Sequence, residues 1–213
     1  MARFGRLPLM ALALILGAVP CRLAEPEWHP LFDGKTLDGW KETPFTRHGT
    51  VRVENGTIIL GKGSMTGITR TKPFPTVNYE VRLEAVRMEG LDFFAGITFP
   101  VKDSYCSWIV GGWGGSVVGL SSIDGDDASE NETSTSRQFE QGRWYSLALR
   151  VTDGWIQAWI DDEKIIEVAT TGRKIDLRPG EIDLSAPFGI ASYSTVAGLR
   201  KLEYRELPPG QDK

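Results

Sequence analysis

Residues 145–168 read YSLALRVTDGWIQAWIDDEKIIEV, and this stretch decides the class of fold. Apolar side chains stand at every second position from 145 to 151, which is the pattern of a half-buried β-strand. Asp153-Gly154 predicts a tight turn into a second strand over 155–160, and residues 161–164 then reverse the chain into a third. Strands joined by such short turns indicate an antiparallel sheet.

The same period of two recurs elsewhere in the chain. Residues 79–85 and 201–205 alternate apolar and charged side chains. Asn55-Gly56 separates two short strand-like runs, at 51–53 and 57–60, with a dipeptide that strongly marks a hairpin. No window carries an amphipathic helix of three turns. The sequence therefore predicts an all-β protein, an antiparallel sandwich of two sheets.

The first residues predict export. Two arginines precede an apolar run over 7–19, which is typical of a signal peptide and too short to remain as a membrane anchor. We therefore assign 1–24 to a signal peptide and expect a periplasmic or extracellular protein. Lipid attachment at Cys21 is possible but not favoured, because a proline stands where a small residue should precede a lipidated cysteine.

The rest of the chain has the size of one domain. We expect a single β-sandwich over 25–207 and a flexible tail over 208–213. The net charge of −4 is small and spread along the chain, so no basic surface favours nucleic acid as a partner. No later apolar run is long enough to span a membrane, and we expect no cofactor.

The two cysteines, Cys21 and Cys106, form no disulfide framework. Cys106 lies in an apolar stretch, where a cysteine usually behaves as a small hydrophobic residue. We therefore expect a buried and unreactive thiol at this position.

The tryptophans are candidates for sugar contacts, because an indole offers a large, stiff apolar face to the C–H bonds of a sugar ring. We expect Trp40 and Trp144 to pack in the core. Trp155 and Trp159 share one face of a strand with Gln157. If the isoleucines of that strand point inward, this aromatic face looks outward and is available to a ligand.

One segment interrupts the strands: residues 111–137 read GGWGGSVVGLSSIDGDDASENETSTSR. Trp113 stands among four glycines, and the second half of the segment is acidic and rich in hydroxyl groups. A loop this long within a compact domain is usually functional or disordered. We expect it to hold the functional site, with Trp113 as the platform for a ligand.

The acids of this segment fit three roles. Calcium takes clustered carboxylate oxygens, although residues 124–126 lack the full spacing of an EF-hand loop. A general acid or base is the second role, and a solvated loop is the third. The sequence leaves these roles open, and with them the question of a bound metal. The acids are Asp124, Asp126, Asp127, Glu130 and Glu132.

The decapeptide LFDGKTLDGW at 31–40 resembles the opening motif of the 3-keto-disaccharide hydrolase domain family. This family consists of exported bacterial proteins with a concanavalin-A-like jelly-roll fold. The resemblance implies that fold here, together with hydrolysis of 3-keto-glycosides. It covers nearly the whole chain after the signal peptide, with further matches at 53–57, 142–145, 158–162 and 188–190.

The activity of the family suggests roles for the acids. A keto group at C3 acidifies the C2 proton, so a carboxylate base removes it, the C1 substituent leaves and water adds back. We take Glu130 first as this base, and Asp127 and Glu132 next. Contacts to the sugar are expected from Trp113, Trp108, Gly112, Gly114, Asp124 and Asn131.

The chain also departs from the family. Members typically carry an Asn-Ser-Gly-Ile segment and a Gln and a His near the C-terminal end, whereas this chain reads FAGI at 94–97 and GIASY at 189–193. The usual polar site therefore does not transfer residue by residue. A non-catalytic carbohydrate-binding module of the cell envelope is the alternative interpretation, and a structural or adhesion domain is a third.

Overall fold

The computed structural model describes Met1 and residues 25–210. The rest of the predicted signal peptide, Cys21 included, and the last three residues of the predicted tail lie outside this part of the chain. Within residues 25–210, no helix is long and apolar enough to cross a membrane.

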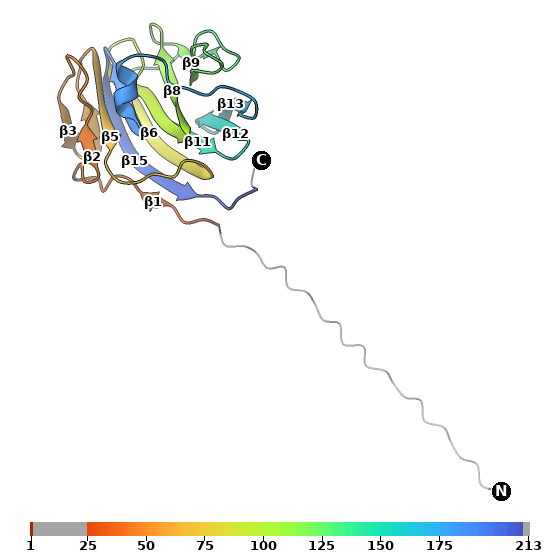
Figure 1. Cartoon of the computed structure of the whole chain (residues 1–213). Helices are drawn as coiled ribbons and strands as arrows, with labels where there is room; N and C mark the ends of the chain where they lie inside the picture. The colour runs from red at the N-terminus through yellow and green to blue at the C-terminus, as the bar shows by residue number, and fades with distance from the viewer. Residues whose placement is uncertain (2–24, 211–213) are drawn as a thin grey trace.

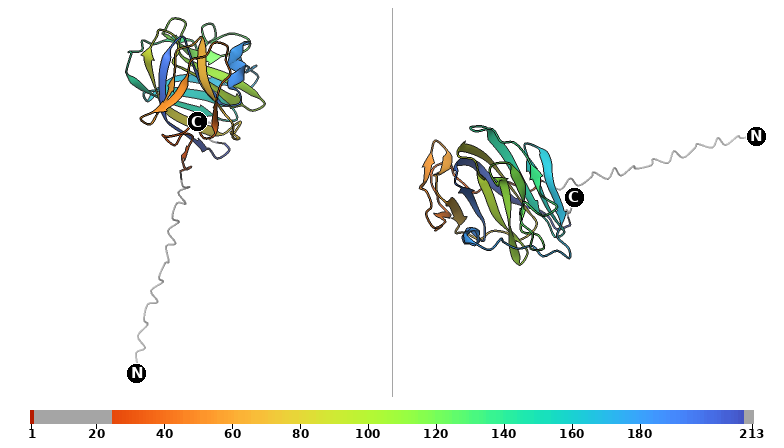
Figure 2. Two further views of the ribbon diagram at one scale, coloured as in Figure 1. Left: turned by 90° about the vertical axis from the view of Figure 1, so that its left-hand side faces the viewer. Right: turned by 90° about the horizontal axis from the view of Figure 1, so that it is seen from above.

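Two antiparallel β-sheets stack face to face, as Figures 1 and 2 show, which confirms the predicted all-β sandwich. One sheet has eight strands in the order β13-β12-β11-β6-β15-β4-β3, with β1 paired to β15. The other has seven strands in the order β10-β9-β8-β7-β14-β5-β2. The elements are β1 His29–Pro30, β2 Trp40–Glu42, β3 Val51–Glu54, β4 Thr57–Leu60, β5 Met65–Arg70, β6 Tyr79–Glu89, β7 Ala95–Val101, β8 Ser104–Gly112, β9 Val117–Ser121, β10 Thr135–Ser136, β11 Trp144–Val151, β12 Trp155–Ile160, β13 Glu163–Ala169, the 3-10 helix η1 Glu181–Ser185, β14 Gly189–Tyr193 and β15 Val196–Glu206.

The hairpins form where the sequence predicts them. Asn55 and Gly56 have φ values of 48° and 75°, the left-handed conformation that a two-residue hairpin turn needs, and they join β3 to β4. Asp153-Gly154 lies between β11 and β12. Asp161 and Asp162 also have positive φ and join β12 to β13. Residues 145–168 thus form one edge of the eight-stranded sheet.

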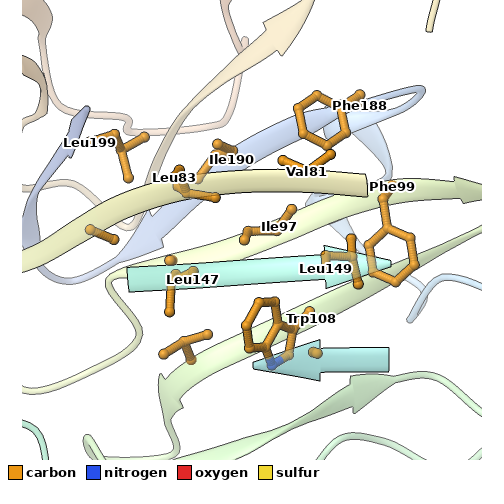
Figure 3. Packing of buried hydrophobic residues seen from close by; sticks show 14 of the residues in the cluster. Val81, Leu83, Ile97, Phe99, Trp108, Leu147, Leu149, Phe188, Ile190 and Leu199 are labelled. Carbon is orange, nitrogen blue, oxygen red and sulfur yellow. The ribbon is translucent and has the colours of Figure 1, made fainter. Parts of the chain in front are cut away.

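The core lies between the two sheets and receives alternate side chains from both (Figure 3). Leu83 and Leu149 come from the eight-stranded sheet, whereas Ile97, Phe99 and Trp108 come from the seven-stranded sheet. Burial of one such side chain stabilises the fold by about 1.5–3 kcal/mol. Burial of these alternate apolar side chains is therefore the main interaction that holds the two sheets together.

Cys106 is fully buried in β8, as predicted, and its Sγ lies 3.7 Å from the carbonyl oxygen of Ser121. Burial raises the pKa of this thiol to about 12. We expect a thiol reagent to label the protein only after unfolding. We also expect Cys106→Ser to lower the free energy of unfolding by about 1–3 kcal/mol, because it buries a hydroxyl group, while ligand binding is unchanged. Rapid labelling of the native protein would contradict this account.

The segment 111–137 differs from the predicted single loop. Val117–Ser121 forms β9 and pairs with β8, and β10 adds two residues at the sheet edge. This part is a strand because Val118 and Leu120 point into the core. The irregular parts are the turn at 113–116 and the loop at 122–134.

Candidate functional site

A pocket of about 430 Å³ lies on the outer face of the seven-stranded sheet. Strands β5, β8, β9 and β14 contribute to it, together with the segment 178–182 that leads into η1. In Figure 1 this short helix lies beside β5. The lining residues are Met65, Asp92, Phe93, Ser107, Ile109, Trp113, Ser121, Asp127, Arg178, Pro179, Gly180, Glu181, Ile182 and Tyr193.

Small hydroxyl side chains occupy the sheet beneath the pocket. Thr98 of β7 and Ser107 of β8 share a hydrogen bond of 2.8 Å between their hydroxyl oxygens, and Ser121 lies opposite Ser107 on β9. Because Trp108 points into the core, strand alternation turns its neighbours Ser107 and Ile109 outward. These short side chains leave a hollow that longer residues would fill.

Asp127 is the acid of the 111–137 segment that reaches this pocket. Its Oδ1 accepts hydrogen bonds from the Ser121 hydroxyl and, at 2.7 Å, from the backbone N–H of Ala128. Its Oδ2 lies 2.9 Å from Nη1 of Arg178. The Asp127 side chain is 15% exposed and the Arg178 side chain 59% exposed. One carboxylate oxygen is thus held by the fold, and the other faces an exposed guanidinium group.

Trp113 stands beside this ion pair. Its side chain is exposed, and its ring centroid lies 5.9 Å from the guanidinium carbon of Arg178. The next residue of the turn is fixed as well, because the Gly114 backbone N–H donates to Oδ2 of Asp92 at 3.2 Å. An exposed indole, a carboxylate and a guanidinium group therefore meet at one end of the pocket.

Arg87 holds the turn of Trp113 from inside the molecule. It is buried, and its guanidinium donates to the carbonyl oxygens of Gly115 at 2.8 Å and of Gly111 at 3.4 Å. Desolvation by burial lowers the pKa of Arg87. A Cβ atom at Gly111 would stand 2.5 Å from the Arg87 guanidinium, so this packing requires a glycine there.

Two further aromatic side chains line the pocket close to the turn of Trp113. Phe93 and Tyr193 stack with ring centroids 5.8 Å apart and an interplanar angle of 29°. Glu181 lies nearby in the lining, and both of its carboxylate oxygens accept from the backbone N–H of Thr46, at 3.0 and 3.1 Å. The pocket thus offers more than one aromatic face.

Three other acids of the predicted site lie outside the pocket. Asp124 Oδ2 and Glu132 Oε1 both bind Arg173, at 2.5 and 2.6 Å. The backbone N–H of Lys174 and the Arg173 side chain lower the pKa of Asp124, and the Arg173 side chain lowers that of Glu132. Glu130 is exposed and does not line the pocket. Across residues 25–210, no three His, Cys, Asp or Glu side chains are grouped to hold a metal ion.

The remaining predicted contacts serve the fold. The buried Asn131 amide donates to the backbone carbonyl of Asp127 at 2.9 Å, which fixes the loop that carries the carboxylate. Trp108 is fully buried in the core and does not line the pocket. Gly112 and Gly114 do not line it either. Of the predicted site residues, the structure brings together Asp127 and Trp113.

The outer face of the eight-stranded sheet carries further tryptophans. Trp155 and Trp159 look outward from β12 while its isoleucines are buried, as the sequence predicted. Trp40 is buried in the core, also as predicted. The sequence places Trp144 in the core too, but it lies half-buried on this outer face. Its ring centroid is 3.9 Å from the guanidinium carbon of Arg200. Strand alternation explains the difference, because the next residue of β11 points inward.

Several pocket residues carry no signal in the sequence. Arg178 precedes Pro-Gly in a stretch without strand period, and nothing local connects it with residue 127. Asp92 and Tyr193 come from loops and strands that only the sheet order brings to one face. The sequence does allow the outward position of Ser107 to be predicted. Residues 106, 108 and 110 are apolar and point into the core, so the residues between them point outward.

This arrangement suits a polyhydroxylated ligand. Hydroxyl, carboxylate and guanidinium groups donate and accept hydrogen bonds, and the exposed rings offer apolar faces for stacking. A carboxylate near a bound ligand is also able to accept a proton from it.

Solved structures of other proteins share this β-sandwich fold. A candidate glycosyl hydrolase from Parabacteroides distasonis superposes with a TM-score of 0.51 at 14% identity, over 85% of this chain and 94% of its own. A carbohydrate-binding module from Bacillus subtilis gives 0.52 at 11% identity, over 79% and 96%. The Crh5 transglycosylase gives 0.55 at 13% identity, over 89% and 87%. At these identities the likeness extends to the fold alone.

The sequence itself matches no curated protein. The family model of the 3-keto-alpha-glucoside-1,2-lyase-like domain, however, matches residues 27–196. This match spans most of the chain and confirms the resemblance seen first in the decapeptide at 31–40. The chain therefore belongs to the 3-keto-alpha-glucoside-1,2-lyase-like domain family.

Proposed function

We propose that this protein cleaves 3-keto-glycosides in the pocket of the seven-stranded sheet, outside the cytoplasm. The observation that carries the proposal is the cluster of Asp127, Arg178 and Trp113. It joins a proton acceptor, a cationic donor and a stacking face in one hollow. Membership of the family supports the choice of a 3-keto sugar over an ordinary glycoside.

Asp127 is the base in this proposal. Its carboxylate takes the C2 proton, which the C3 keto group makes acidic, and the electron pair of the C2–H bond gives an enolate at C3, which returns to the ketone as the C1=C2 double bond forms. The C1–O bond breaks, and the leaving oxygen takes a proton from solvent. Addition of water across the double bond, with OH at C1 and H at C2, completes a net hydrolysis. No redox change occurs.

Arg178 stabilises the charge that develops in this step. Removal of the C2 proton moves negative charge onto the C3 oxygen, and a preorganised cationic donor lowers the energy of that state. The Arg178 side chain is 59% exposed, so water screens its pair with Asp127 and the guanidinium is available to a substrate. Substrate binding would then separate the pair and free the carboxylate to act as base.

A non-catalytic binding module is the second candidate function. It is favoured by the hydrogen bonds that already occupy the acids of the pocket, since Asp127 binds Arg178 and Glu181 binds the backbone of Thr46. Under this alternative the pocket holds a sugar and no bond is cleaved.

An assay of the purified protein separates the two functions. Release of the aglycone should be followed from a 3-keto-glucoside and from the matched unmodified glucoside. The proposal expects release from the keto compound alone. Binding of a saccharide without release from either compound would support the binding module and overturn the proposal.

Trp113→Ala should weaken sugar binding in the pocket by about 1–3 kcal/mol, through loss of a large stacking face. This corresponds to roughly 5–150-fold in the dissociation constant, measured by calorimetry with an unreactive analogue of the substrate. Trp144→Ala is the matched control, because it makes the same truncation on the opposite sheet. Equal affinities of the two variants would show that Trp113 is not a platform.

A further inference from the structure

A second hollow lies on the outer face of the eight-stranded sheet, on the opposite side of the sandwich from the pocket. Its volume is about 720 Å³, and it crosses β12, β11, β6 and β15, four neighbouring strands. The lining residues are Arg82, Leu83, Glu84, Ser146, Leu147, Ala148, Trp159, Asp162, Lys201 and Glu203.

Two short side chains create this hollow. Ser146 and Ala148 are successive outward residues of β11, and Trp159 lies opposite Ala148 on β12. A smaller hollow of about 170 Å³ shares Arg82, Ala148 and Trp159 with the first, and the two together form a trough that extends towards Trp28. Arg150 lies 5.7 Å from the Trp159 ring centroid but lines only the smaller hollow. The Trp159 indole itself borders both hollows.

Charged side chains on β6 and β15 form the other side of the trough. Nη2 of Arg82 lies 2.7 Å from Oε2 of Glu203, and Nζ of Lys201 lies 2.6 Å from Oε1 of Glu84. Asp162 adds an unmatched negative charge to the lining. The lining holds two cations and three acids, and Arg200 beside it also pairs with Oε2 of Glu84 at 2.6 Å, so no excess of positive charge favours an anion. Its donors and acceptors instead suit hydroxyl groups.

We propose that this trough is a second saccharide-binding site, and that it takes a neutral glycan chain. The sugar stacks one face on Trp159 over the short side chains of Ser146 and Ala148. Its hydroxyl groups bind the Arg82–Glu203 and Lys201–Glu84 pairs, which present carboxylate and ammonium or guanidinium groups side by side. Because the trough and the pocket lie on opposite sheets, one molecule holds a polymer on one face and leaves the pocket of the other free.

Affinity electrophoresis tests this site separately from the pocket. The purified protein should carry Trp113→Ala, which weakens the pocket, and should run in native gels that contain a soluble β-glucan, mannan or xylan. Polygalacturonate serves as the anionic probe. We expect at least one neutral polysaccharide to retard this protein and polygalacturonate not to do so. No retardation by any neutral polysaccharide, or stronger retardation by polygalacturonate, overturns the proposal.

Two variants locate the binding on the trough. In the Trp113→Ala background, Trp159→Ala should weaken the retardation at least tenfold, whereas Trp144→Ala, on the same sheet face but outside the hollow, should leave it unchanged. Ser146→Tyr should weaken it at least as much, because the larger side chain fills the exposed hollow and leaves Trp159 in place. Thermal unfolding of each variant checks the fold. Retention of binding by folded Ser146→Tyr protein contradicts the site, whatever the activity of the pocket proves to be.

Discussion

Asp127→Asn should lower kcat for a 3-keto-glucoside by about 10²–10⁴-fold and leave KM nearly unchanged. Asparagine keeps the shape of the side chain and still accepts from the Ser121 hydroxyl and the Ala128 N–H, so the loop stays in place. It is unable to take a proton from C2. Steady-state release of the aglycone measures kcat, and calorimetry with an unreactive analogue measures binding.

Glu130→Gln is the control for this experiment. The sequence makes Glu130 the first candidate for the base, but its exposed carboxylate lies outside the pocket. We therefore expect Glu130→Gln to keep the activity of the unchanged protein. The opposite result, with activity lost in Glu130→Gln and kept in Asp127→Asn, would identify Glu130 as the base and contradict the proposed site.

Trp108→Ala should lower the free energy of unfolding by about 3–5 kcal/mol, the usual cost of removing a fully buried aromatic side chain. The effect arises in the core, where the indole packs between the sheets (Figure 3). The ligand affinity of the folded fraction should not change. Denaturant unfolding measures the first quantity, and calorimetry below the unfolding transition measures the second.

Trp108→Phe is the matched variant for the core, because it keeps an aromatic ring and should lose much less stability than Trp108→Ala. If Trp108→Ala left stability intact and removed ligand affinity, Trp108 would be a binding residue, as the sequence first suggested, and the description of the core would be wrong.

Strands and hairpins could be predicted because their signals are local. Asn55-Gly56 determines a two-residue turn by its own conformational preferences, whatever lies around it. The outward position of Trp155 and Trp159 follows from alternation within one strand. The prediction for Trp144 was wrong, because residue 144 belongs to the outward half of β11, in which Tyr145 points inward.

The site was harder to predict because it is assembled across sheets and loops. Asp127 and Glu130 are three residues apart in the same irregular loop, and composition does not distinguish them. Contacts made by Ser121, Asn131 and Arg178 turn only Asp127 into the pocket. These partners come from a neighbouring strand, the loop itself and a segment about fifty residues later, and no local pattern of this sequence joins them.

The most direct test of the central claim is the fate of the C2 hydrogen. The purified protein should be incubated in D₂O with a 3-keto-glucoside, and the released 3-keto sugar analysed by mass spectrometry and NMR. Elimination with Asp127 as base requires removal of the C2 proton, so the account expects more deuterium at C2 of the product than the same 3-keto sugar takes up without protein, and loss of turnover in Asp127→Asn. Release of a product that retains its original hydrogen at C2 would contradict it.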